Sequence, residues 1–249
     1  MLRVKGLSKS FGAMQALYPI DLTLDAGKTL AIVGESGSGK TTLGRCLMRL
    51  TPASSGQIFF RDKDILQLDD QQLRSMRRHM QIIFQDPYAA LNPRLTIETI
   101  LREPFVIHKI KHDQAHLIAL LDRCGLPRQA LARYPHEFSG GQRQRICIAR
   151  ALALEPELLI CDEPMAALDV SIQAQIMNLL LDLQRDFGLS YIFISHDLKL
   201  VQYIAHSVGV LYQGRLIELG PAEEIFLHPR HAYTQALLSA IPSFEHRVK

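Results

Sequence analysis

The sequence predicts an α/β fold whose core is a parallel sheet. Short apolar runs, each the length of one strand, alternate along the chain with segments of helical periodicity. One run leads directly into a glycine-rich loop that opens a helix, and another ends in two acidic residues. Strands buried on both faces of a parallel sheet are continuously apolar, and helices connect them. Ligands of such folds gather where the strands end, so we expect the chemistry of this chain there.

The individual core elements follow from the same patterns. The expected core strands are Leu30–Val33, Gln81–Phe84, Leu158–Cys161 and Tyr191–Ile194. A helix is expected where apolar residues recur at helical spacing, and its apolar face would pack on the sheet. The members of this stripe are Ile172, Ile176, Leu179, Leu180, Leu183 and Phe187.

The N-terminal part predicts an antiparallel β subdomain beside the parallel sheet. Its short strands are expected at Arg3–Gly6, Ile20–Leu24 and Gln57–Phe60. Nearer the C-terminus, Gln213-Gly214 separates two strand-like runs, and a two-residue link containing glycine is typical of a hairpin. The two runs are Val208–Tyr212 and Arg215–Leu219.

Residues 92–133 contain no strand-like run. Within this range, Thr96–Phe105 and Asp113–Cys124 have helical patterns. Because strand-containing segments lie on both sides, we expect a small helical subdomain inserted into the α/β core.

Composition bounds the function. The chain has 249 residues, and its 28 Lys and Arg against 25 Asp and Glu give a net charge of +3. This small excess does not indicate nucleic acid as a partner, because such binding needs a concentrated basic face. The four cysteines show no CxxC spacing, which favours reduced, buried thiols over a zinc or redox site. The sequence has neither a signal peptide nor an apolar run long enough to span a membrane, so we expect a cytoplasmic chain.

The glycine-rich loop fits the P-loop pattern G-x-x-x-x-G-K-[ST]. Its residues are Gly34, Glu35, Ser36, Gly37, Ser38, Gly39, Lys40 and Thr41. Glycines let the backbone N–H groups converge on an anion, and the following helix adds the positive end of its dipole. Lys40 is expected to reach the β- and γ-phosphates of a nucleotide, and the Thr41 hydroxyl to bind Mg²⁺. Thr42 is placed to contact the α-phosphate.

Two acidic residues end the run Leu158–Cys161. A strand buried in a parallel sheet carries acids only at its tip, where they meet ligand or water. After a P-loop, Asp162 is expected in the Mg²⁺ shell. Glu163 lies one residue further out and is expected to polarise the attacking water.

The segment Phe138–Arg145 resembles the signature motif of ABC ATPases. Ser139, Gly140, Gly141 and Gln142 stand at the start of an expected helix, Gln142–Leu154, which is a second helix N-terminus able to bind phosphate. In that family this second nest closes over the ATP of a partner subunit. The resemblance therefore implies a dimer with two ATP molecules at its interface. Phe138 stands where the family usually has Leu, a tolerable apolar exchange.

Further positions match the family one by one. Phe11 corresponds to the aromatic residue that stacks on adenine, although core packing is the alternative for a lone Phe. Gln85 corresponds to the glutamine that touches Mg²⁺ and senses the γ-phosphate, and His196 to the switch histidine. Asp169 ends a loop, Ala166–Asp169, that couples the two sites across the dimer. Ala166 replaces the usual Ser, which puts one contact across that dimer in doubt.

The resemblance implies a single ABC ATPase domain over residues 1–249. Its parts are a nucleotide-binding core with the antiparallel subdomain at 1–91 and 134–220, a helical subdomain at 92–133 and a helical tail at 221–249. Gln85–Arg94 and His228–Pro242 resemble the ATPases of oligopeptide, dipeptide and nickel importers. Together these features imply an importer motor that uses ATP and Mg²⁺ at the cytoplasmic face of the membrane.

The resemblance also implies the partners of such a motor. They are two transmembrane permease subunits, a second ATPase subunit of the same or a sister chain and, indirectly, an extracytoplasmic binding protein. The alternative class is a cytoplasmic ABC ATPase without a transport role, such as an assembly scaffold. An exporter motor and a nucleotide-binding regulator without hydrolysis also stay open. Co-purification with membrane-spanning partners would discriminate the importer from the scaffold.

Overall fold

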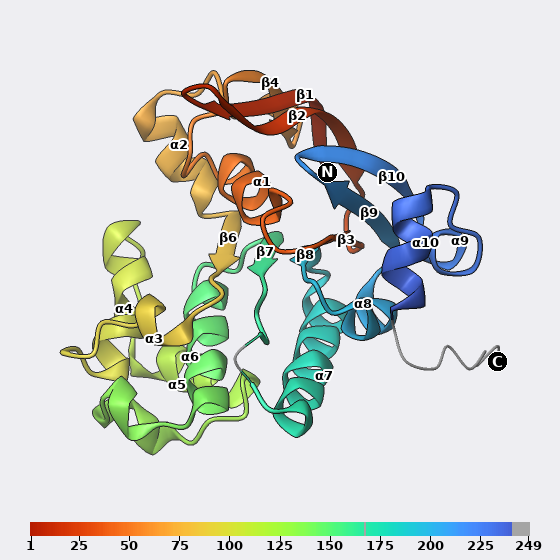
Figure 1. The fold of residues 1–249 in the computed structure, drawn as a ribbon. Helices are drawn as coiled ribbons and strands as arrows, with labels where there is room; N and C mark the ends of the chain where they lie inside the picture. Colours follow the sequence, from red (N-terminus) through yellow and green to blue (C-terminus); the bar gives the residue numbers. More distant parts are fainter. Residues whose placement is uncertain (167, 241–249) are drawn as a thin grey trace. The chain divides into compact units, whose positions relative to one another are not determined.

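A computed structural model describes residues 1–166 and 168–240. The chain forms two compact units. The first unit consists of residues 1–24, 28–66 and the part from 192 onward, and the second of residues 25–27 and 67–191. Figure 1 shows the ribbon with its element labels.

An antiparallel sheet of order β2-β1-β4-β5 belongs to the first unit. Its strands are β1 (Leu2–Phe11), β2 (Met14–Leu24), β4 (Ser55–Phe60) and β5 (Lys63–Asp64). β1 pairs with β2 from Leu2 opposite Leu24 to Phe11 opposite Met14. The expected antiparallel subdomain is therefore present, but β1 and β2 are much longer than the expected strands. Their pairing continues over polar stretches that carry no apolar alternation.

The first unit also holds the P-loop and the strands beside it. β3 (Thr29–Val33) pairs in parallel with β9 (Ser207–Tyr212), and β9 pairs antiparallel with β10 (Arg215–Pro221). Every residue of β3 is buried, as its unbroken apolar run predicts. The expected hairpin forms at Gln213 and Gly214, whose φ angles of 46° and 76° suit a tight turn between twisted strands.

Helices of the first unit follow these strands. They are α1 (Lys40–Leu47), α8 (Leu198–Ile204), α9 (Ala222–Leu227) and α10 (Ala232–Ser239). Figure 1 shows α9 and α10 beside β9 and β10. Two helices, α9 and α10, therefore lie within the range 221–249, whereas the assignment of this range as a separate tail stays a prediction. Residues 241–249 lie outside the described part of the chain.

In the second unit, β6 (Met80–Ile83) pairs in parallel with β7 (Leu158–Asp162). β8 (Ser190–Ile194) is divided, with Ser190 and Tyr191 in this unit and the remainder in the first. The helices are α2 (Asp70–Arg77), α3 (Pro87–Ala90), α4 (Ile97–Ile107), α5 (Gln114–Arg123), α6 (Gly140–Leu152) and α7 (Val170–Phe187). Short 3₁₀ turns lie at Arg128–Ala132 and Pro135–Glu137.

The helices expected between residues 92 and 133 form as α4 and α5, whereas the assignment of this range as a subdomain stays a prediction. In α7 the predicted stripe is buried at Ile176, Leu180 and Leu183. The Tyr191 hydroxyl donates to the Leu180 carbonyl across 2.8 Å, which attaches α7 to the start of β8. The prediction was wrong at Phe187, because this residue is 47% exposed. The Arg123 guanidinium lies 4.7 Å from the centroid of its ring.

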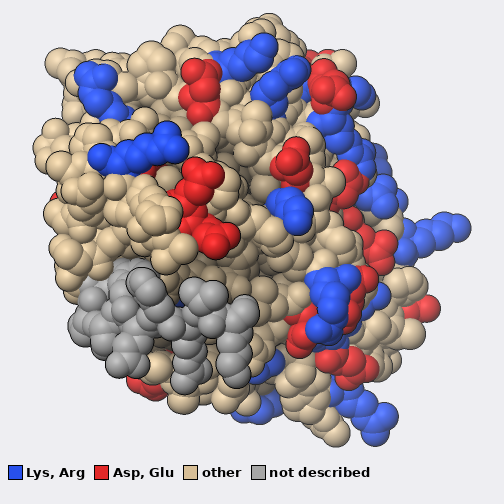
Figure 2. All heavy atoms as spheres, turned by 90° about the vertical axis from the view of Figure 1, so that its right-hand side faces the viewer, with Lys and Arg blue, Asp and Glu red and all other residues tan. Residues whose placement is uncertain are grey.

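On the face drawn in Figure 2, charged side chains of both signs occur among the described residues. Lys and Arg lie there close to Asp and Glu.

Candidate functional site

The P-loop follows β3 and opens α1. Gly34 has a φ of 147°, and a Cβ at this position would lie 2.1 Å from the Leu211 carbonyl oxygen, so only glycine fits. Gly39 has a φ of 107° and is the N-cap of α1, where no side chain caps the helix. The first N–H groups of α1 therefore point out of the helix end without a capping side chain. Such an end attracts anions.

Lys40 is drawn into this loop and is only 4% exposed. Its Nζ donates to the carbonyl oxygens of Gly34, at 2.8 Å, and Glu35, at 2.7 Å. The Ser38 hydroxyl is also buried, and its Oγ has no hydrogen-bond partner among the described residues. A buried ammonium, a buried hydroxyl without a partner and an uncapped helix end together provide donors for a phosphate chain.

Three more predicted residues lie in the same unit. Thr41 and Thr42 occupy the first turn of α1 and are half-buried. Phe11 ends β1, and its ring is 47% exposed with the Lys9 ammonium 4.6 Å from its centroid. The core-packing alternative for Phe11 is therefore excluded, and the ring is available to a flat ligand.

His196 stands in a turn just after β8. The turn is fixed on both sides of it: Ser195 N–H donates to the Ile32 carbonyl across 3.2 Å, and Asp197 N–H donates to Ser195 Oγ across 2.9 Å. Asp197 then caps α8 by accepting from Lys199 N–H across 2.9 Å. The exposed His196 side chain thus stands on a rigid strand-to-helix turn.

The second unit carries the predicted residues Asp162, Glu163 and Gln85. Asp162 ends β7 and is 3% exposed. Glu163 follows with a φ of 47°, in the left-handed region that non-glycine residues avoid. Backbone strain of this kind concentrates at functional sites, where it aims a side chain. Gln85 Nε2 donates to Glu163 Oε2 across 3.3 Å, so the structure brings these two predicted residues together.

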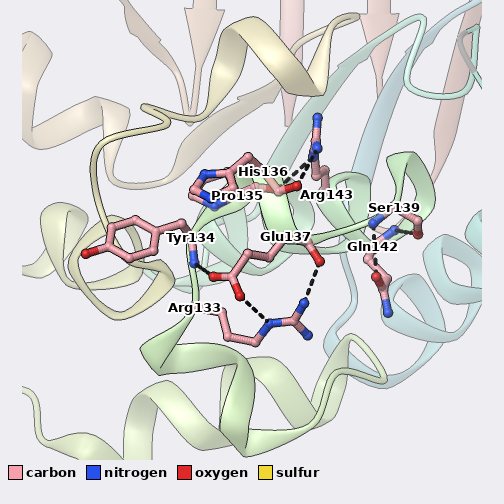
Figure 3. A network of polar contacts seen from close by, with 8 residues as sticks. All are labelled: Arg133, Tyr134, Pro135, His136, Glu137, Ser139, Gln142 and Arg143. Carbon is pink, nitrogen blue, oxygen red and sulfur yellow. Dashed lines mark hydrogen bonds and ion pairs between the residues drawn. The ribbon is translucent and has the colours of Figure 1, made fainter.

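The signature segment forms a capped helix start, drawn in Figure 3. Gln142 N–H donates to Ser139 Oγ across 3.3 Å, and Ser139 N–H donates to Gln142 Oε1 across 3.1 Å. The helix α6 begins at Gly140, two residues earlier than predicted, because Ser139 and Gln142 make this reciprocal capping box. Gly141 has no room for a side chain, since a Cβ would lie 2.5 Å from Ile172 Cγ2 of α7.

The turn before the signature is held by two arginines (Figure 3). Arg143 Nε donates to the Pro135 carbonyl across 2.8 Å, from inside α6. The Glu137 carboxylate accepts from Tyr134 N–H across 2.6 Å and from Arg133 Nε across 3.3 Å. The backbone donor at Tyr134 is the main reason that the pKa of Glu137 lies below its ordinary value.

Comparison with known proteins identifies the family. The family model described as "ABC transporter" matches residues 17–166, more than half of the chain. The chain belongs to the ABC transporter family. A second model, "Oligopeptide/dipeptide transporter, C-terminal region", matches residues 217–249.

Curated relatives and solved cassettes agree with this assignment. The chain is 50% identical over 247 residues to the glutathione import ATP-binding protein GsiA of Escherichia coli strain K12, covering 98% of this chain and 40% of GsiA. It is 50% identical to the oligopeptide transport ATP-binding protein AppF of Bacillus subtilis, covering 94% of this chain and 72% of AppF. The chain thus spans less than half the length of GsiA.

Solved structures share the fold. CbiO1 from Clostridium perfringens, part of the ABC transporter complex CbiONQ, superposes with a TM-score of 0.81 at 30% identity, covering 91% of this chain and 90% of CbiO1. A dimeric ATP-binding cassette in a post-hydrolysis state, bound to ADP and Pi, gives a TM-score of 0.79 at 27% identity. That match covers 89% of this chain and 99% of the other cassette. The predicted cassette fold is therefore confirmed.

In this cassette, the segment after Gln85 is attached to the signature helix by contacts that the sequence did not predict. The Arg143 guanidinium lies 4.0 Å from the centroid of the Tyr88 ring. Arg150, further along α6, donates from Nη1 to the Ala90 carbonyl across 2.6 Å. The sequence patterns singled out both segments separately, and nothing in them indicates that they touch.

The loop that was expected to couple the two sites is described only in part, because Ala167 lies outside the described residues. Asp169 is exposed and is the N-cap of α7, yet its side chain makes no capping bond. Val170 beside it is 82% exposed.

Among residues 1–166 and 168–240, no three His, Cys, Asp or Glu side chains gather in a way that would hold a metal ion. No helix formed by them has both the length and the apolar character needed to cross a membrane.

Proposed function

We propose that this chain is the ATP-hydrolysing subunit of an importer for peptides or for peptide-like or metal-chelate cargo. The observation that carries the proposal is the match of residues 217–249 to the C-terminal region of oligopeptide and dipeptide transporters. Relatives named for glutathione import and oligopeptide transport support it. An exporter motor and a scaffold gain no such support.

ATP binding rests on the P-loop. The Lys40 ammonium and the N–H groups at the start of α1 bind the phosphates, the Thr42 hydroxyl contacts the α-phosphate, and the exposed Phe11 ring stacks on adenine. Thr41, Gln85 and Asp162 are the residues that would hold Mg²⁺, which offsets the charge on the phosphate oxygens when it is bound. These donors fit it, because hydroxyl, amide and carboxylate oxygens are its preferred ligands.

Hydrolysis rests on Glu163. Its carboxylate accepts a proton from the attacking water while Gln85 steadies it from 3.3 Å. His196 orients the water and contacts the γ-phosphate. Attack is in line, and the leaving ADP departs without a covalent enzyme intermediate.

Transport requires partners. Ser139, Gly140, Gly141 and Gln142 close over the ATP of a second cassette, with Asp169 at the same interface. Hydrolysis then opens this dimer. The segment from Gln85 to Pro104 passes the motion to two permease subunits at the cytoplasmic face of the membrane. Cargo reaches the permease from an extracytoplasmic binding protein.

Uptake by living cells tests this function. Cells lacking the chain receive the wild type, Lys40→Ala or Lys5→Ala, the last a control at an exposed lysine of β1. Uptake of a radiolabelled dipeptide, tripeptide and glutathione is measured. We expect Lys40→Ala to abolish uptake of at least one of them and Lys5→Ala to leave it intact. Uptake of all three that does not depend on the chain would contradict the proposal.

Mild solubilisation of native membranes distinguishes the importer subunit from the alternative, a cytoplasmic assembly scaffold. We expect the tagged chain to co-purify with two multi-span proteins. Recovery only from the soluble fraction, together with cytoplasmic proteins, would favour the assembly scaffold and would leave the ATP chemistry untouched.

A further inference from the structure

The C-terminal helix α10 reaches the P-loop through one side chain. The Tyr233 hydroxyl accepts a hydrogen bond from the Glu35 backbone N–H across 3.1 Å, between residues 198 positions apart. Both residues belong to the first unit. Tyr233 lies within the region that matches oligopeptide and dipeptide transporters.

Glu35 also contacts Lys40, through its carbonyl group rather than through its N–H. Its carbonyl oxygen accepts from Lys40 Nζ across 2.7 Å and from Ser38 N–H across 3.2 Å. The N–H of Glu35 is therefore bound to Tyr233, and its C=O is bound to Lys40. A loop that is already fixed by such hydrogen bonds loses less conformational entropy on ligand binding than a free loop does.

Tyr233 is itself well fixed. Its ring lies against that of Tyr212 from β9, with the ring centroids 4.1 Å apart. Its N–H donates to His231 Nδ1 across 3.1 Å, which begins α10. Burial raises the pKa of Tyr233, so its hydroxyl stays neutral in ordinary buffers.

The entry into α10 is anchored on the neighbouring strand. The Glu218 carboxylate in β10 accepts from Arg230 N–H across 2.8 Å and from His231 N–H across 3.2 Å. Tyr212 and Glu218 thus attach the C-terminal segment to the β9–β10 hairpin. Strand β9 also packs closely against the P-loop, because a Cβ on Gly34 would clash with the Leu211 carbonyl oxygen.

We infer that Tyr233 is a positioning residue for ATP binding, through which the C-terminal segment braces the P-loop at Glu35. The inference rests on the proposed ATP site. It assigns to the C-terminal segment a role inside its own cassette, where it tunes nucleotide affinity. Tyr233 acts through Glu35 and the lysine that Glu35 holds.

The test uses the full-length protein with Tyr233→Phe, which removes the hydroxyl and keeps the ring on Tyr212. The matched control is Tyr203→Phe, whose ring is 75% exposed on α8. A neutral hydrogen bond is worth about two- to tenfold in an equilibrium constant. We therefore expect Tyr233→Phe to raise the Kd and KM for ATP about threefold to tenfold, with kcat changed by about twofold or less.

Amide hydrogen exchange supplies a readout that a general loss of stability would not give. We expect faster exchange in the P-loop peptide containing Glu35 in Tyr233→Phe, with exchange in the β1–β2 hairpin unchanged. An unchanged Kd together with unchanged exchange at Glu35 would overturn the inference. An equal Kd shift in Tyr203→Phe would overturn it as well.

The variant Lys40→Ala distinguishes failure of this inference from failure of the proposed ATP site on which it rests. If Lys40→Ala loses ATP binding while Tyr233→Phe binds ATP like the wild type, only the positioning role of Tyr233 is wrong. If Lys40→Ala keeps wild-type affinity, the proposed ATP site itself is wrong.

Discussion

The side-chain amide of Gln85 donates to the Glu163 carboxylate across 3.3 Å, between Nε2 and Oε2. Glu163 is also the residue whose backbone is held at a φ of 47° beyond the end of β7. One group thus steadies the carboxylate, and a strained backbone presents it. Both features suit a general base that needs one fixed orientation.

Gln85→Ala is expected to lower kcat about tenfold, because the Glu163 carboxylate loses an orienting donor worth about one hydrogen bond. ATP turnover by the purified protein measures this. Gln71→Ala, at an exposed glutamine of α2, is the matched control and should leave kcat unchanged. Equal rates in Gln85→Ala and the wild type would show that this contact does not orient the base.

Signature and P-loop are expected to act in different copies of the chain. Lys40→Ala and Ser139→Phe each inactivate a dimer of identical subunits. A mixed dimer keeps one site with an intact P-loop and an intact partner signature, so ATPase activity should return when the two variants are mixed. No recovery from two well-folded variants would contradict a sandwich of two copies.

The contact between Tyr88 and Arg143 is expected to be energetically coupled. A double-mutant cycle with Tyr88→Leu and Arg143→Met, followed by urea unfolding, should give an interaction free energy of about 0.5–1 kcal/mol. Tyr88→Leu combined with Arg102→Met in α4 is the control cycle and should be additive. Additivity in both cycles would mean that the segment after Gln85 is not held through this ring.

The four thiols are expected to be inert in the folded protein. Burial raises the pKa of Cys124 to about 12 and that of Cys147 to about 11, and it also raises the pKa of Cys46 and Cys161. Alkylation by iodoacetamide at pH 8, followed by mass spectrometry, should be roughly a hundredfold slower than in urea. A thiol that reacts equally fast in both conditions would contradict this burial.

The same thiols set the sign of an alkaline effect on stability. Above about pH 8.5 the thiols of the unfolded chain ionise while the buried ones stay protonated. The unfolded state then binds fewer protons, so the free energy of unfolding falls as the pH rises.

The sequence predicted those elements whose formation depends on residues close together in the chain. The apolar run Leu30–Val33 predicts a buried strand because its period and length allow little else, and it forms within β3. The hairpin at Gln213-Gly214 follows in the same way from its turn residues. The antiparallel strand β1 was underestimated because its second half alternates poorly, and its length is set by pairing with β2.

Contacts between distant segments leave no periodic signal. The hydrogen bond of Tyr233 to Glu35 joins residues 198 positions apart, and the Tyr88–Arg143 contact joins two separate motifs. The sequence marked the segments that hold these residues through resemblance to a family. Only the folded chain shows which side chains within them meet.

A comparison of ATP binding with ATP turnover in Glu163→Gln tests the proposed hydrolysis most directly. The exchange keeps the shape of the side chain and removes its basicity, so we expect unchanged ATP affinity and a kcat lowered about 10²- to 10⁴-fold. Glu223→Gln, at an exposed position of α9, controls for the loss of one charge. Phosphate release by Glu163→Gln at the wild-type rate would contradict the assignment of the base and with it the proposed mechanism.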